Sequence, residues 1–133
     1  PIEEVENAYE SVFQILLEYQ QFLNKLNTQL IVLLFPQRFQ VQSRDWELTV
    51  KEYALDKSCF DLDQPNKRIM KFCEKNNLKC IDPTPKMRIL HEITGNEYYL
   101  PLGDMHWNAQ GHEVLVESIW REFSPDLDPS HLP

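Results

Sequence analysis

Apolar residues recur at alternating spacings of four and three along the start of the chain, which is the period of an amphipathic helix. The spacing predicts a helix over residues 3–27, with one apolar stripe made of Val5, Tyr9, Val12, Leu16, Tyr19, Leu23 and Leu26. The same spacing is typical of a coiled coil, but the run is shorter than four heptads, and Phe13, Leu17 and Phe22 widen its apolar face. We therefore expect this helix to pack on a sheet.

The following segment, "LIVLLF" at residues 30–35, is continuously apolar and ends at Pro36. Such a run predicts a strand buried on both faces, as in a parallel sheet covered by helices. "LKCID" at 78–82 predicts a second short strand. Helical patterns are expected at 65–77, 84–93 and 108–123, and 44–55 has room for a short helix.

A helix between two such strands implies that they run parallel. The element order therefore predicts an α/β fold, namely a partial three-layer αβα sandwich with a short parallel sheet. Two or three strands bury too little surface on their own. We expect the sheet to continue in another segment, through self-association or a complementary N-terminal segment.

Composition narrows the classes of function. The 133 residues suffice for one domain, over residues 1–123, followed by a loose proline-rich tail at 124–133. A net charge of −8 argues against a nucleic-acid or anionic membrane partner, and no apolar run is long enough for a membrane span. The start at Pro1 suggests a piece of a longer protein, and the odd cysteine count (Cys59, Cys73, Cys80) argues against a disulfide framework.

The segment "GDMHWNAQGH" at 103–112 holds the candidate chemistry. Asp104 lies two residues before His106, so its carboxylate can fix the imidazole in one tautomer while the other ring nitrogen accepts a proton from a nucleophile. Asn108 is placed to cap the following helix, and Gly111 allows a close approach of a neighbouring element. Trp107 is expected as a packing anchor. A D-x-H pair alone is a weak signal, because Asp104 can equally cap a turn.

The wider block "YYLPLGDMHWNAQGHEVLVESIW" resembles the last conserved block of the SGNH/GDSL hydrolases, in the D-x-H-W-N-x-x-G-H form of bacterial esterases and of relatives that acetylate or deacetylate polysaccharide. "LIVLLFPQRFQV" and "NKRIMKFCEKNNLKCIDPTP" resemble that family's fourth strand and its next helix and strand. The resemblance implies the C-terminal half of a flavodoxin-like SGNH domain. It also implies the orienting role for Asp104, the general-base role for His106, and work outside the cytoplasm at the cell envelope.

The departure from that family is large, because its Gly-Asp-Ser nucleophile block and its oxyanion-hole residues are missing. The serines are Ser11, Ser43, Ser58, Ser118, Ser124 and Ser130, and none lies in a glycine-framed turn. We therefore expect the acid–base half of a serine esterase or O-acyl transferase, acting on a small-molecule or carbohydrate ester without a cofactor.

Two alternatives to this half-enzyme remain open. The first is a non-catalytic binding or assembly module that self-associates. The second is a metal site of Asp104, His106 and His112, although His112 is more simply a packing residue and no fourth ligand is evident.

Overall fold

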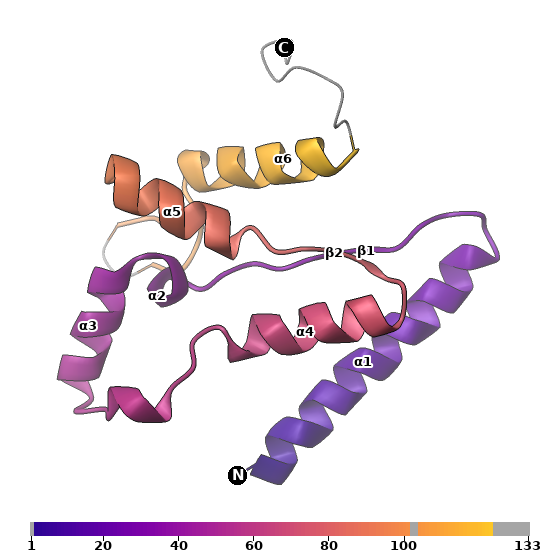
Figure 1. The fold of residues 1–133 in the computed structure, drawn as a ribbon, viewed down its shortest axis with the longest axis horizontal. Coiled ribbons are helices and arrows are strands. Elements are labelled where there is room, and N and C mark those ends of the chain that lie inside the picture. Colours follow the sequence, from indigo (N-terminus) through magenta and orange to yellow (C-terminus); the bar gives the residue numbers. More distant parts are fainter. Residues whose placement is uncertain (1, 102–103, 124–133) are drawn as a thin grey trace. The chain divides into compact units, whose positions relative to one another are not determined.

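The computed structural model describes residues 2–101 and 104–123, and the predicted tail at 124–133 lies outside them. The elements in chain order are α1 (Ile2–Asn24), β1 (Ile31–Leu33), α2 (Arg38–Val41), α3 (Ser43–Glu52), the 3-10 helix η1 (Lys57–Cys59), α4 (Gln64–Lys75), β2 (Lys79–Ile81), α5 (Thr84–Thr94) and α6 (Ala109–Phe123) (Figure 1). None of the helices in these ranges is long and apolar enough to cross a membrane.

The fold is mostly helical, and the predicted three-layer αβα sandwich is wrong. Helix makes up 64% and strand 7% of the described residues, and β1 and β2 form a parallel pair of three residues each. One hydrogen bond, from Leu34 N to Ile81 O (2.9 Å), extends the pair by a residue. Pro36 and Pro83 follow closely and have no N–H group to continue a ladder. The strands are half-buried along most of their length rather than covered on both faces, so they do not form a sheet layer.

The chain divides into two compact units. Of the described residues, the first unit comprises 2–32 and 67–80, and the second comprises 33–66, 81–101 and 104–123. In the first unit α1 packs against α4: the rings of Phe13 and Phe72 stack at 4.1 Å, and Arg68 binds Glu6 and lies 3.9 Å over the ring of Tyr9. The long helix thus packs on a helix and not on a sheet.

The predicted apolar stripe of α1 is divided between two environments. Tyr9, Leu16 and Leu23 are half-buried, whereas Val5, Val12, Tyr19 and Leu26 are exposed. The buried side of the helix is instead completed by residues between the predicted positions, including Phe13, Leu17 and Gln20.

The second unit has its own core between α2, α5, α6 and the segment before α6. Its buried apolar residues are Val41, Met87, Tyr98, Tyr99, Trp107, Val114 and Leu115, with Leu33, Leu90 and Ile119 packed around them. On α6 the buried apolar pair is Val114 and Leu115, and Val116 is 51% exposed. Pairs such as Arg88 with Asp63 (2.6 Å) add polar links between α5 and the segment before α4.

Several local predictions agree with this structure. α3 overlaps the expected segment at 44–55, and α4, α5 and α6 lie close to the expected ranges 65–77, 84–93 and 108–123. Gly95 ends α5 in the left-handed conformation (φ 70°). Its N–H donates to His91 O at 2.8 Å, which closes the last turn.

Candidate functional site

The candidate site is built on a short antiparallel ladder that leads into α6. Tyr99 pairs with Trp107, Leu100 N donates to His106 O (2.9 Å), and Asn108 N donates to Tyr98 O (3.0 Å). The aromatic and branched side chains at these positions favour extended backbone. The ladder fixes the backbone of His106 to a buried strand segment, even though its side chain points into solvent.

Asn108 and Gly111 connect this ladder to the first turn of α6. Asn108 Oδ1 accepts a hydrogen bond from Gly111 N (2.9 Å), which is the geometry of a helix N-cap, and its Nδ2 donates to Glu97 O (2.6 Å). A Cβ on Gly111 would lie 2.4 Å from Tyr98 O, so only glycine allows this approach of helix to strand. Both residues have the local roles predicted from the sequence.

The structure brings Asp104 and His106 into contact. One carboxylate oxygen, Oδ1 of Asp104, accepts from His106 N (2.8 Å) and lies 2.6 Å from His106 Nδ1. These hydrogen bonds hold the pKa of Asp104 below its usual value. The side chains are 41% and 86% exposed, respectively, so the pair lies at the surface, and no described group binds the Nε2 atom of His106.

Sequence reasoning missed Arg38, which lies behind this pair. Its Nη1 donates to Leu100 O (2.9 Å), and its Nε lies 3.0 Å from Asp45 Oδ2. The positive charge of Arg38 is a lesser cause of the lowered pKa of Asp104. No motif or spacing marks Arg38, because it is far from Asp104 in sequence and reaches the site only through the fold of the second unit.

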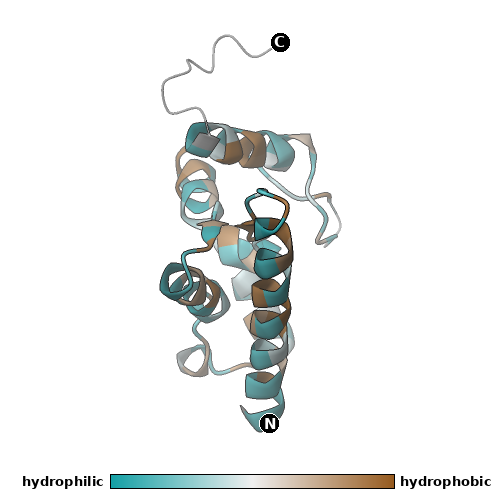
Figure 2. Cartoon of the chain, turned by 90° about the vertical axis from the view of Figure 1, so that its right-hand side faces the viewer, coloured by the Kyte–Doolittle hydropathy of each residue, from teal (hydrophilic) through white to brown (hydrophobic). Residues whose placement is uncertain are grey.

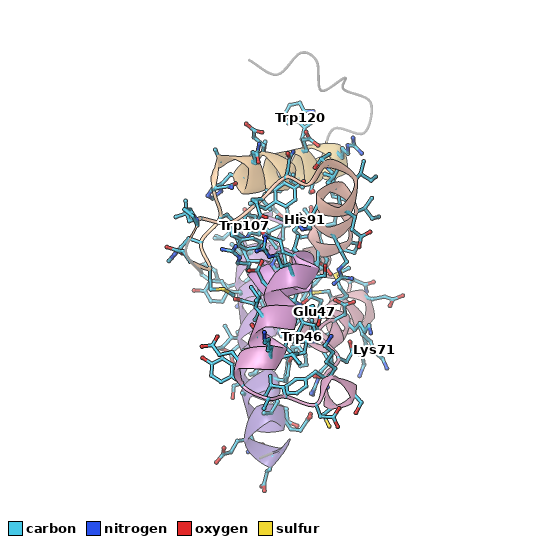
Figure 3. The ribbon with its side chains drawn as sticks, turned by 90° about the vertical axis from the view of Figure 1, so that its left-hand side faces the viewer. Trp46, Glu47, Lys71, His91, Trp107 and Trp120 are labelled. Carbon is cyan, nitrogen blue, oxygen red and sulfur yellow. The ribbon has the colours of Figure 1, made fainter. Side chains whose placement is uncertain are left out.

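A groove of about 620 Å³ begins at His106. It is lined by Phe35, Pro36, Gln37, Leu100, Met105, His106, Trp107 and His112. Phe35 is 58% exposed, and its ring lies 4.7 Å from that of Trp107, which is buried beneath α6 (Figure 3). His112 also lines the groove and contacts the Trp107 ring edge-on at 5.9 Å. The groove thus offers an apolar wall beside an imidazole.

A further hydroxyl lies near this groove but is not suited to proton transfer. Tyr99 OH donates to Pro36 O (2.9 Å), and burial raises the pKa of Tyr99. It therefore stays protonated at neutral pH and serves to join the ladder to the segment after β1.

The described part of the site contains no nucleophile. None of the groove-lining residues is a serine, threonine or cysteine. The hydroxyls of Ser11, Ser58 and Ser118 bind Asn7 O, the Asp56 carboxylate and Val114 O. Over residues 2–101 and 104–123, no three His, Cys, Asp or Glu side chains are arranged to hold a metal ion, so Asp104, His106 and His112 are not such a group.

Comparisons with protein-family models, curated proteins and solved structures gave no match for this chain. The geometry of the site is therefore the basis for a functional proposal. That geometry consists of a hydrogen-bonded carboxylate and imidazole on a short antiparallel ladder, with an apolar groove beside them.

Proposed function

We propose that Asp104 and His106 form the carboxylate–imidazole pair of a serine esterase or O-acyl transferase. The observation that carries the proposal is the double contact of Asp104 Oδ1 with the backbone N and the ring Nδ1 of His106. A carboxylate at Nδ1 keeps the proton of the neutral imidazole on that atom, so Nε2 is a free base. It also stabilises the imidazolium that forms when Nε2 takes a proton.

The reaction uses a serine that lies outside the described residues. As its hydroxyl oxygen attacks the ester carbonyl carbon, His106 Nε2 takes the hydroxyl proton and a tetrahedral oxyanion forms. The C–O bond to the alcohol then breaks, and His106 gives the proton to the leaving oxygen. Water, or a sugar hydroxyl in acyl transfer, repeats the sequence on the acyl-enzyme and releases the serine.

The groove indicates what the pair acts on. Phe35, Leu100 and Met105 give it an apolar wall next to His106, which suits the hydrocarbon part of an acyl group better than a charged one. The small-molecule or carbohydrate ester that we propose as substrate follows from the resemblance to the SGNH hydrolases, and the apolar wall suits its acyl part. The serine and the oxyanion donors come from a complementary N-terminal segment, as the resemblance to the SGNH hydrolases implies. The fold lends no support to that resemblance, so the proposal stands on the pair and its terminal block.

Nitrogen-15 NMR of the histidine rings in this chain tests the pair directly. In the neutral imidazole of His106 we expect the proton on Nδ1, and Asp104→Ala should shift it toward Nε2. His112 is the matched control, since it lines the same groove, and its tautomer should not respond to Asp104→Ala. A His106 ring that is indifferent to Asp104→Ala would refute the orienting role.

Activity measurements test whether the nucleophile and the oxyanion donors lie outside this chain. The isolated chain should hydrolyse p-nitrophenyl acetate no faster than free imidazole, because it lacks the nucleophile and oxyanion donors. A parent protein with the upstream segment should turn over the ester and lose activity in His106→Ala. Turnover by the isolated chain that depends on His106 would mean that a nucleophile lies within these residues.

A non-catalytic binding or assembly module is the second candidate function. The observation in its favour is the 86% exposure of the His106 side chain, since catalytic pairs work best where water is excluded. The two candidates separate on one result. A parent protein that carries a serine reactive toward a fluorophosphonate, with labelling lost in His106→Ala, is an enzyme.

A further inference from the structure

The face of α1 that does not pack on α4 carries a second apolar stripe. Its members are spaced alternately by three and four residues: Val5, Ala8, Val12, Ile15, Tyr19 and Phe22. All six are exposed, the aromatic pair most strongly, with Tyr19 at 58% and Phe22 at 60%. Figure 2 shows apolar stretches alternating with polar ones along the helix that begins at the N label. We call this set the outer stripe.

The outer stripe is large for a surface in contact with water. At about 150–250 Å² for an aromatic side chain and less for an aliphatic one, the exposed fractions of the larger members and of the neighbouring Leu26 give roughly 600 Å² of apolar surface. These fractions lie between 45% and 60% for Val5, Val12, Ile15, Tyr19, Phe22 and Leu26. The largest apolar patch on a typical monomer is about 300–600 Å². The smallest specific interfaces bury about 600 Å² on each partner. One copy of this stripe therefore offers about the area that a small dimer needs from each chain.

We propose that the outer stripe binds the outer stripe of a second copy of this chain, with the two α1 helices antiparallel. The spacing assigns Val5, Val12 and Tyr19 to heptad position a, and Ala8, Ile15 and Phe22 to position d, without a polar interruption. Such a seam fits another helix with the same repeat. The proposal does not depend on the role of Asp104 and His106.

Side-chain size along the stripe selects the antiparallel direction. The N-terminal half holds small residues (Val5, Ala8, Val12), and the C-terminal half holds larger ones (Ile15, Tyr19, Phe22). An antiparallel pair places Val5 opposite Phe22 of the second copy, Ala8 opposite Tyr19 and Val12 opposite Ile15. Every layer then combines a smaller with a larger side chain. A parallel pair would leave a gap at Ala8 and crowd two aromatic rings at Tyr19.

Charge selects the same direction and register. Four glutamates, Glu3, Glu4, Glu6 and Glu10, lie in the first half of α1, and Lys25 lies just beyond its end. In the register above, Glu4 and Lys25 both occupy position g, and each Glu4 faces Lys25 of the second copy, which gives two symmetric ion pairs. Of these glutamates only Glu4 flanks the seam, since Glu3, Glu6 and Glu10 occupy positions f, b and f, and a parallel pair would place Glu4 and Lys25 at opposite ends of the seam, too far apart to pair. The antiparallel arrangement also opposes the helix dipoles favourably.

The size and charge gradients explain why the partner is a second copy rather than an unrelated helix. Each half of the outer stripe is the complement of its other half, so the surface is complementary to itself under a two-fold rotation. That is the property of an isologous interface. A surface that binds a different protein does not need to be complementary to a second copy of itself.

Sedimentation of the full chain tests the pairing through charge. The unaltered chain should form a dimer at micromolar concentrations. Lys25→Glu turns both ion pairs into repulsions and should weaken the dimer by about ten- to thirtyfold. Glu4→Lys added to Lys25→Glu restores both pairs with reversed sign and should bring the affinity back to within about threefold. Gln21→Glu adds one negative charge, half of the change made by Lys25→Glu, at an exposed position outside the stripe and should leave the dimer unchanged.

Cysteine pairing tests the direction. In a Cys59→Ser background, which removes the exposed thiol, Ala8→Cys and Tyr19→Cys chains are mixed and oxidised with glutathione disulfide. The antiparallel register predicts a disulfide between the two different chains, with two thiols oxidised and glutathione released. Ala8→Cys alone should not cross-link, because the two copies of residue 8 would lie about 16 Å apart along the helices.

The outcomes decide the proposal. A monomer throughout the micromolar range, whether its stripe is solvent-exposed or covered by other parts of the same chain, overturns it. Efficient cross-linking of Ala8→Cys with itself indicates a parallel pair and overturns the antiparallel register. A dimer that withstands Lys25→Glu as well as it withstands Gln21→Glu uses another surface, and this also overturns the proposal.

Discussion

Replacing Gly111 by alanine tests how the site is joined to the fold. A methyl group there would lie 2.4 Å from Tyr98 O and 3.1 Å from Trp107 Cβ. The first contact is with backbone, so no side-chain rotation relieves it. The start of α6 must move by about 1 Å from Tyr98 to reach ordinary contact, and overpacking of this kind costs about 2–3 kcal/mol.

The same substitution has a favourable part, because alanine in a helix interior is more stable than glycine by about 1 kcal/mol. The net expected loss is therefore about 1–2 kcal/mol in the free energy of unfolding, or a fall of about 4–8 °C in Tm for a chain of this size. Urea and thermal unfolding followed by far-UV circular dichroism measure both. We further expect the displaced first turn to lengthen the Asn108 cap and to disturb the Trp107 resonances.

Gly95→Ala is the matched control for this substitution. Gly95 has φ 70° but no atom within 4 Å of an added Cβ, so its cost comes from backbone strain alone and is about 1 kcal/mol. It should leave Trp107 and His106 undisturbed. A Gly111→Ala chain that is as stable as the unaltered one, or more so, would refute the close contact between α6 and the Tyr98 strand.

The remaining predictions concern the residues around the pair. Asn108→Ala should cost at least about 1 kcal/mol in the free energy of unfolding, measured with urea, because it removes both the helix cap and the Nδ2 donor to Glu97 O. In a parent enzyme, Asp104→Asn and His106→Ala should each lower kcat sharply without adding in the double variant, whereas His112→Ala should change it little. The lowered pKa of Asp104 means that its contribution to stability is complete above the unfolded carboxyl pKa of about 3.9 and is lost as pH falls through the lower folded pKa. The stability difference between the unaltered chain and Asp104→Asn should therefore stay constant at neutral pH and shrink only in acid.

The parts of the site that the sequence predicted are those governed by neighbours in the chain. Asn108 caps α6, Gly111 allows a close approach, and Asp104 contacts His106, and each contact joins residues a few positions apart or follows from glycine itself. Capping and turn chemistry depend on such short separations, so one sequence is enough to predict them.

Contacts between residues far apart in the sequence could not be predicted from such local patterns. The run at 30–35 correctly predicted a strand, but its apolar character did not reveal that only three residues would pair and that no layers would cover them. Arg38 and Phe35 join the site across more than sixty residues, and no local signal marks either. On α1 the apolar positions fit two overlapping periods, and the periodicity could not decide which side of the helix would be buried.

The last prediction follows from the division of the chain into two units. The outer stripe belongs to the first unit, while Asp104, His106 and the groove belong to the second. Because no residue of the stripe takes part in the hydrogen bonds of the pair, Lys25→Glu should weaken the dimer by about ten- to thirtyfold without changing the His106 tautomer. Asp104→Ala should shift the tautomer and leave sedimentation unchanged. NMR and sedimentation on the same two variants show whether the His106 tautomer and dimerisation are independent. A His106 ring that responds to Lys25→Glu would mean that dimerisation and the chemistry of the site are coupled, and that the exposed pair is completed by the second copy.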